Sequence, residues 1–203
     1  MPKIKICGLT RPEDAQAAAE LGADAVGLVF YAKSKRCVDA AQAAEIAATL
    51  PPQVAKVALF VNETADSIHR ILAAVPIDIV QFHGDEVPEF CRQFGKPYWK
   101  AVRVHSAQDI AEAVGYYADA AALLLDAHIE GQYGGTGKVF DWRLLPATMP
   151  LSWVLSGGLN PGNVAAAVRQ TRAAWLDVSS GVEQAPGIKS RDLMADFIQK
   201  ARG

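Results

Sequence analysis

The amino-acid sequence predicts an α/β fold in which eight strand–helix units close into a single barrel. The main observation is that short runs of β-branched and other apolar residues alternate with Ala-rich helical segments along all 203 residues. Such alternation is typical of a parallel sheet whose strands are connected by helices. Hydrophobic residues make up 51% of the chain, which suits a sheet buried on both faces. No linker or low-complexity tract divides the sequence, so residues 1–203 are expected to form one domain.

Eight runs have the length and composition of buried strands. They are, in order, Ile4–Cys7, Ala25–Phe30, Ala55–Val61, Ile77–Phe82, Tyr98–Arg103, Ala121–Asp126, Trp153–Leu155 and Trp175–Val178. A helical pattern follows each of them, over Pro12–Leu21, Ala40–Ala48, Thr64–Ala74, Val87–Phe94, Ala107–Tyr117, Asp141–Leu145, Pro161–Gln170 and Ser190–Arg202. This number of units favours a (β/α)8 TIM barrel. The alternative is a doubly wound open sheet, but the first strand lacks the GxGxxG fingerprint that such a sheet often carries.

Capping residues support several of the helix boundaries. Thr10, Asn160 and Ser190 lie where a side-chain oxygen can accept a hydrogen bond from the first turn of a helix. Gly22 and Gly95 lie where helices are expected to end.

Charge, hydropathy and cysteine content exclude several classes of protein. The formal net charge is −2 and no segment is a basic run, so we expect no nucleic-acid partner. No apolar stretch reaches the roughly 18 residues of a membrane span, and the N-terminal residues lack the apolar region of a signal peptide. A cytoplasmic protein is therefore expected. Cys7, Cys37 and Cys91 are odd in number and widely spaced, which argues against a disulfide framework or a zinc site.

Polar side chains are expected at the C-terminal ends of four strands, where the active sites of such barrels form. Because strand side chains alternate between faces, Cys7 shares the inward face of the first strand with Lys5. His83, Asp126 and Asp177 lie at the ends of the fourth, sixth and eighth strands. Each of these residue types also has a common role outside catalysis. A free cysteine is often a small core residue, an aspartate after a strand is often a cap, and a histidine is often structural.

Two glycine- and serine-containing loops follow the seventh and eighth strands. The first contains Gly157 and Gly158, and the second contains Ser179, Ser180 and Gly181. In barrels these two loops commonly bind a phosphate group, because glycine lets backbone N–H groups approach an anion and serine adds a donor. A short helix that starts after Gly181 would also direct its positive end at the anion. The alternative is two ordinary turns.

These motifs, in this order, resemble those of the phosphoribosylanthranilate isomerases, a family of tryptophan biosynthesis. The resemblance covers the whole chain, with two small departures at Phe82 and at Tyr31-Ala32. It is carried by Lys5–Thr10, Gly27–Phe30 with Ser34–Arg36, Val57–Asn62, Gln81–Asp85, Leu125-Asp126 with Gly134–Gly137, Ser156–Leu159 and Asp177–Glu183.

The resemblance implies an Amadori rearrangement of N-(5-phosphoribosyl)anthranilate to 1-(2-carboxyphenylamino)-1-deoxyribulose 5-phosphate. Asp126 would be the general acid that opens the furanose ring, and Cys7 the general base that takes the proton from C2 of the sugar. Arg36 would bind the anthranilate carboxylate. His83 and Asp177 would line the sugar site. Two proton transfers suffice, so no metal or cofactor is expected.

Two further expectations concern the surroundings of the reacting groups. Lys5, two residues before Cys7 on the same face, could stabilise the thiolate and line the substrate site. The glycines of Gly134–Gly137 resemble the hinges of a mobile flap.

The sequence is also compatible with two other functions. A related aminoaldose isomerase of histidine biosynthesis would use a carboxylate at the end of the first strand, where this chain has Cys7. A non-catalytic phosphosugar-binding barrel would keep the glycine loops without needing Cys7 and Asp126 together. We expect a monomer rather than a homodimer, because no segment has an obvious apolar docking patch.

Overall fold

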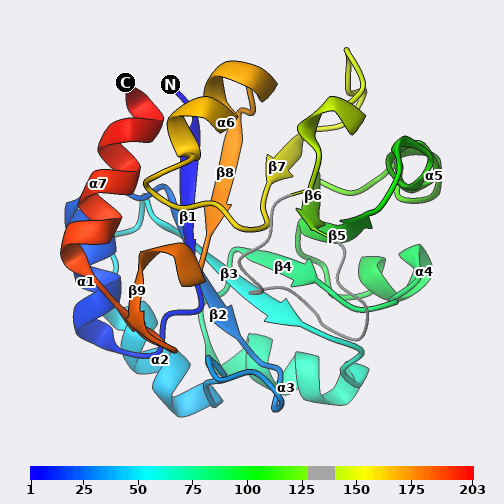
Figure 1. Ribbon diagram of the computed structural model, residues 1–203. Coiled ribbons are helices and arrows are strands. Elements are labelled where there is room, and N and C mark those ends of the chain that lie inside the picture. The colour runs from blue at the N-terminus through cyan, green and yellow to red at the C-terminus, as the bar shows by residue number, and fades with distance from the viewer. Residues whose placement is uncertain (128–139) are drawn as a thin grey trace.

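The computed structural model describes residues 1–127 and 140–203. Eight parallel strands close into a barrel in sequence order, and helices cover its outer surface (Figure 1). The strands are β1 (Lys3–Cys7), β2 (Ala25–Val29), β3 (Ala55–Phe60), β4 (Ile79–Phe82), β5 (Tyr98–Val104), β6 (Ala122–Ala127), β7 (Trp153–Leu155) and β8 (Trp175–Val178). The predicted (β/α)8 barrel is therefore confirmed.

Seven α-helices and two short 3₁₀ helices lie in the described part of the chain. The α-helices are α1 (Pro12–Glu20), α2 (Ala40–Ala48), α3 (Ala65–Ala74), α4 (Pro88–Arg92), α5 (Ala107–Tyr116), α6 (Val164–Thr171) and α7 (Arg191–Arg202). The 3₁₀ helices are η1 (Trp142–Leu144) and η2 (Ser180–Val182). Among these residues, no helix is long and apolar enough to cross a membrane.

The register of the barrel sets which side chains point inward. Ile4 and Ile6 are fully buried in the core beneath the helices. Lys5 lies between them on β1 and is opposite Asp177 of β8 in the register, and their side chains meet inside the barrel at 2.7 Å. The alternation predicted for the first strand is therefore confirmed.

Several local predictions were wrong. The helix expected over Asp141–Leu145 is a single 3₁₀ turn, and α6 begins at Val164 rather than at Pro161. Asn163 stands at the N-cap of α6, because the Asn160 amide oxygen is used by the N–H of Gly162 in the preceding turn.

Tertiary contacts explain two further differences. Arg11 rather than Thr10 stands at the N-cap of α1, and the Thr10 hydroxyl donates to the carbonyl of Gly187 at 2.6 Å. The sequence also gave no sign of a small antiparallel hairpin, β9 (Glu183–Ala185) with β10 (Ile188–Lys189), after the eighth strand. This hairpin carries two buried charged side chains, Glu183 and Lys189.

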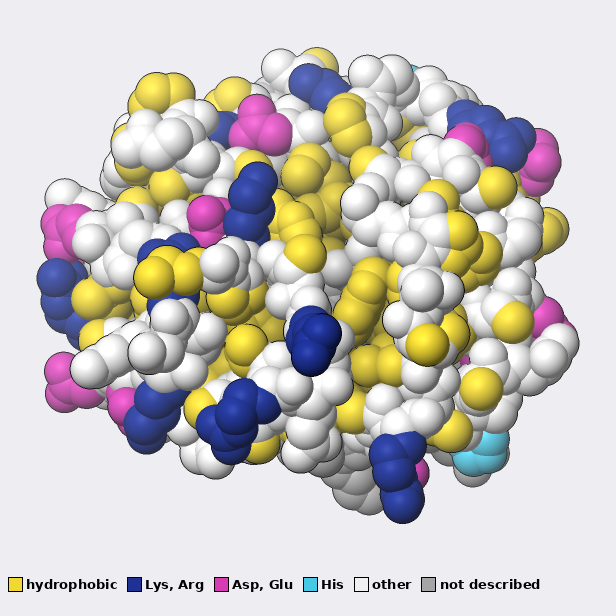
Figure 2. Space-filling model, turned by 90° about the horizontal axis from the view of Figure 1, so that it is seen from above, with side chains coloured by type: hydrophobic (Ala, Val, Ile, Leu, Met, Phe, Trp, Pro, Cys, Tyr) yellow, Lys and Arg dark blue, Asp and Glu magenta, His cyan; other side chains and the backbone are white. Residues whose placement is uncertain are grey.

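The two ends of the barrel differ in composition. Both chain termini and the start of β1 lie at the upper end in Figure 1, and Figure 2 views the molecule from this side. Inside this end the side chains form an apolar layer, which we call the floor cluster; it consists of Trp99, Ala101, Ala122, Leu124 and Val154, with Ile79 and Trp175 packed against them. The polar side chains lie at the opposite end, where the strands finish.

Candidate active site

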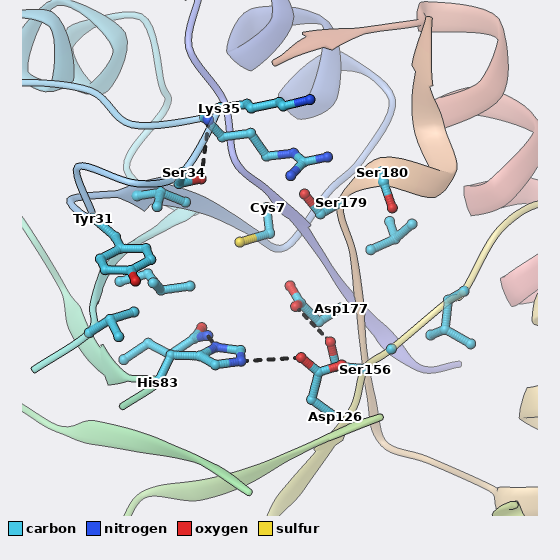
Figure 3. Close-up of a pocket in the computed structure, with 18 of the residues that line it drawn as sticks. Cys7, Tyr31, Ser34, Lys35, His83, Asp126, Ser156, Asp177, Ser179 and Ser180 are labelled. Atoms are coloured by element: carbon cyan, nitrogen blue, oxygen red, sulfur yellow. Dashed lines mark hydrogen bonds and ion pairs between the residues drawn. The ribbon is translucent and has the colours of Figure 1, made fainter. Parts of the chain in front are cut away.

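A cavity of about 640 Å³ opens at the C-terminal end of the strands. This volume is in the range of small-molecule sites. Figure 3 shows Cys7, His83, Asp126 and Asp177 around the same space. Every catalytic, substrate-binding and phosphate-binding residue predicted from the sequence lines this cavity, except Lys5 and Gly181, which lie beside it.

His83 and Asp126 form a hydrogen-bonded pair at the end of β4 and β6. His83 Nε2 lies 3.1 Å from Asp126 Oδ2, and the other ring nitrogen, Nδ1, lies 3.0 Å from Gln81 Nε2. Because an amide nitrogen donates, Nδ1 accepts and Nε2–H is the donor to Asp126. Asp126 Oδ1 accepts the N–H of Ala127 at 2.9 Å. The aspartate is therefore held in one orientation by both of its oxygens.

Gln81, which was not among the predicted site residues, is fully buried beneath His83. Its Oε1 atom has no hydrogen-bond partner among the described residues. The signal in the sequence was its parity with His83 on the same strand, which also places it on the inward face.

A second polar group lies deeper, between β1, β7 and β8. Lys5 Nζ donates to Asp177 Oδ1 at 2.7 Å, and the Ser156 hydroxyl donates to Asp177 Oδ2 at 3.1 Å. Lys5 is completely buried, and burial by itself would lower its pKa. The attraction of Asp177 outweighs this, so the pKa of Lys5 is raised and it stays charged. Lys5 therefore lies behind the cavity rather than on its surface.

Cys7 is at the end of β1 and is 5% exposed. Burial raises the pKa of the Cys7 thiol above its usual value, and the neighbouring Lys5 and Lys189 oppose this rise only in part. The predicted influence of Lys5 on Cys7 thus has the expected direction. The thiol nevertheless predominates at neutral pH.

Arg36 lies on the loop after β2, and its guanidinium is bound to Glu183. Nε donates to Glu183 Oε1 and Nη2 donates to Oε2, both at 2.7 Å. Lys189 Nζ lies 2.8 Å from the same carboxylate. The sequence motif contained Glu183 but did not indicate this pairing, and Lys189 was missed because the hairpin that carries it was not predicted.

The loops after β7 and β8 pack directly against each other. A side chain at Gly181 would collide with the Leu159 carbonyl of the neighbouring loop, so this close approach requires glycine. Gly157, Gly158, Ser179 and Ser180 line the cavity beside this contact. The helix expected after Gly181 is the 3₁₀ turn η2, which already starts at Ser180.

The opposite wall of the cavity is apolar. Cys7, Val29, Leu59 and Val61 form a small hydrophobic cluster, and Tyr31 packs against it. The cavity thus has one wall of glycines and hydroxyl groups and another of aliphatic side chains. The segment Gly134–Gly137, predicted as a flap, lies outside the described residues.

Nothing in the described ranges 1–127 and 140–203 groups three or more His, Cys, Asp or Glu side chains closely enough to hold a metal ion. The cavity instead offers proton donors and acceptors: one thiol, one imidazole–carboxylate pair and several hydroxyl groups.

Comparison with known proteins gives a consistent result. Residues 4–200 match the family described as "N-(5'phosphoribosyl)anthranilate (PRA) isomerase". A relative from Neisseria meningitidis serogroup B, named N-(5'-phosphoribosyl)anthranilate isomerase, is 57% identical over 199 residues, covering 98% of this chain and 96% of its own.

Solved structures agree with the sequence comparison. Phosphoribosyl anthranilate isomerase from Thermotoga maritima has a TM-score of 0.92 and 42% identity, with 100% of both chains covered. A phosphoribosyl anthranilate isomerase in complex with reduced 1-(o-carboxyphenylamino)-1-deoxyribulose 5-phosphate has a TM-score of 0.86 and 40% identity, again over 100% of both chains.

Proposed function

The chain belongs to the N-(5'-phosphoribosyl)anthranilate isomerase family of tryptophan biosynthesis, and on this premise we propose how its residues perform the rearrangement. The observation that carries the proposal is that Cys7, Asp126 and the two glycine loops line one cavity. A solved relative binds a reduced phosphorylated product of this chemistry. That relative supports a small phosphorylated substrate for this chain.

The substrate lies across the cavity from the glycine loops to the apolar wall. Its phosphate binds at Gly157, Gly158, Ser179, Ser180 and Gly181, where small residues allow close approach of the backbone to an anion. Its aromatic ring packs against Val29, Leu59 and Val61, which suit an apolar group.

Binding of the phosphate at one end of the substrate and of the aromatic ring at the other fixes the position of the sugar between them. Arg36 also lines the cavity, and we assign it to the carboxylate of the ring. The ribose then lies between Cys7 and Asp126, which also line the cavity.

Asp126 acts as the general acid. It protonates the furanose ring oxygen, the C1–O bond breaks, and the nitrogen lone pair forms a protonated Schiff base at C1. The carboxylate left on Asp126 keeps two donors, His83 Nε2–H and the Ala127 N–H. These hydrogen bonds stabilise the negative charge that develops during proton transfer.

Cys7 acts as the general base. Its thiolate, which is the minor form at neutral pH, removes the proton from C2. The C–H electron pair forms the C1–C2 double bond of the enolamine as the iminium nitrogen becomes neutral. Conversion to the ketone moves one proton from O2 to C1 within the product. The enzyme is then left with a protonated Cys7 and an ionised Asp126, and proton exchange with solvent restores both groups.

The test is direct turnover of N-(5-phosphoribosyl)anthranilate made in situ, followed by the change in fluorescence between substrate and product. We expect Cys7→Ala and Asp126→Asn each to lower kcat by at least about 100-fold, with the circular dichroism spectrum and the affinity for inorganic phosphate retained. A kcat close to that of the wild type in either variant would refute the assigned role. Phosphate binding by the wild type without turnover would instead indicate a phosphosugar-binding barrel.

A further inference from the structure

Among the described residues, Glu183 pairs with one edge of the Arg36 guanidinium and no residue occupies the other. Nε and Nη2 donate to the two carboxylate oxygens, which is the bidentate geometry of a side-on pair. A guanidinium has five N–H groups, so three remain, two on Nη1 and one on Nη2. These form a second edge that can bind another carboxylate in the same bidentate way.

Glu183 is itself held firmly in place. Its side chain is 5% exposed, and it accepts a hydrogen bond from Lys189 Nζ, which also donates to the Ser179 carbonyl at 3.1 Å. Burial alone would raise the pKa of Glu183, but Arg36 and Lys189 lower it below its usual value. The carboxylate therefore stays ionised at neutral pH and fixes the plane of the guanidinium.

The backbone and the side chain of Arg36 are also held in this position by neighbouring residues. Its backbone N–H donates to the Ser34 hydroxyl at 3.1 Å. Gly8, at the end of β1, leaves the space through which the Arg36 methylene groups pass, because a side chain at Gly8 would collide with Arg36 Cδ. The loop, Gly8 and Glu183 together leave the guanidinium little freedom.

We propose that Glu183 is a positioning residue that holds the second edge of the Arg36 guanidinium ready for the carboxylate on the aromatic ring, and so sets the preference for carboxylated substrates. The inference rests on the proposed function, because it assigns Arg36 to that carboxylate. Glu183 acts only through Arg36 and touches no reacting atom.

The charge balance of the group agrees with this role. Arg36 and Lys189 carry two positive charges and Glu183 carries one negative charge, which leaves one net positive charge for an anionic ligand. Burial lowers the pKa of Lys189, and the attraction of Glu183 opposes this. Without Glu183, Lys189 would lose its proton more readily, so removal of the carboxylate would add little attraction to compensate for a disordered arginine.

The test compares N-(5-phosphoribosyl)anthranilate with its aniline counterpart, which lacks the carboxylate. For Glu183→Leu we expect KM for the anthranilate compound to rise about tenfold, because a long side chain must be ordered on each binding event. KM for the aniline compound should change by less than about twofold. Glu183→Gln, which keeps one acceptor oxygen, should give an intermediate rise.

A matched control is available on the other side of the barrel. Glu86 is also buried, 3.5 Å from the buried Lys100, but its carboxylate binds the N–H groups of Asn62 and Gly84 rather than Arg36. Glu86→Gln should therefore raise KM for both compounds alike or for neither.

Arg36→Lys keeps the positive charge and can still pair with Glu183, but an ammonium group has no second edge of N–H donors. This variant should therefore lose the preference for the carboxylated compound. It tests the inference even if the Glu183 variants do not fold. Equal rises in KM for both compounds in Glu183→Leu, a lower KM for the anthranilate compound, or a preserved preference in Arg36→Lys would each overturn the inference. Equal KM values in the wild type would instead refute the assignment of Arg36, whatever the Glu183 variants show.

Discussion

The two ends of the barrel are built from the same strands but have opposite chemistry. At the floor, Leu124 and Trp175 belong to an apolar layer. Two residues further along the same strands, Asp126 and Asp177 project into the polar end. The floor stabilises the barrel by burial of apolar area, whereas the polar end buries charges that must be paired to be tolerated. Stability and reactivity are thus separated along each strand by only two residues.

The largest expected loss of stability comes from the polar end. Lys5→Met would leave Asp177 buried without its counter-charge and should lower the free energy of unfolding by about 3–5 kcal/mol. Because Lys5 opposes the rise of the Cys7 pKa, the pH at which Cys7 is half alkylated should also rise. Urea unfolding and site-resolved mass spectrometry after alkylation would measure the two effects.

The double variant Lys5→Met with Asp177→Asn serves as the control, since it removes both charges and should recover part of the lost stability. An unchanged alkylation profile in Lys5→Met would show that Lys5 does not influence the thiol.

The floor should respond in stability alone. Leu124 is fully buried, so Leu124→Ala should lower the free energy of unfolding by about 3 kcal/mol through lost burial and the cavity left behind. The kcat should stay within about threefold of the wild type. Asp126→Asn on the same strand should instead lower kcat strongly and change the free energy of unfolding little. A large loss of kcat in Leu124→Ala would contradict the separation of the two ends.

Acid should lower the stability of the protein through the polar end, because the side chains of the floor cluster have no ionisable group. The lowered pKa of Glu183 means that its contribution to stability is complete above its ordinary value of 4.5 and is lost as the pH falls through the lower folded value. Urea unfolding between about pH 5 and pH 3 should show a weaker pH dependence for Glu183→Gln than for the wild type. An identical slope would mean that other carboxylates dominate.

The smallest change is expected at Gln81. Gln81→Met loses the hydrogen bond to His83 but also removes an acceptor that has no partner among the described residues. These effects oppose each other, so the free energy of unfolding should change by less than about 1 kcal/mol. The exposed Gln108→Met is a suitable control for the substitution itself. A loss of several kcal/mol would show that Oε1 makes a favourable contact in solution.

The architecture follows from local patterns in the sequence. Alternating strand and helix patterns placed all eight strands within a few residues of their observed bounds, because buried parallel strands require continuous apolar runs that are visible locally. Strand parity also placed Lys5, Cys7 and His83 on the inward face, since that parity depends only on the two-residue repeat. The order of the motifs then identified the family.

The pairing of the polar groups, in contrast, depends on the folded barrel. Thr10 and Asn160 have the right chemistry to cap helices, but the N-caps are Arg11 and Asn163, and the side chains of Thr10 and Asn160 bond to Gly187 and Gly162 in the folded loops. Likewise, Arg36 and Glu183 are separated by 147 positions. Their contact depends on barrel closure and on the hairpin after β8, so no local pattern could show it. Short-range periodicity specifies elements and faces, whereas the partners of buried charges follow from the closure of the whole barrel.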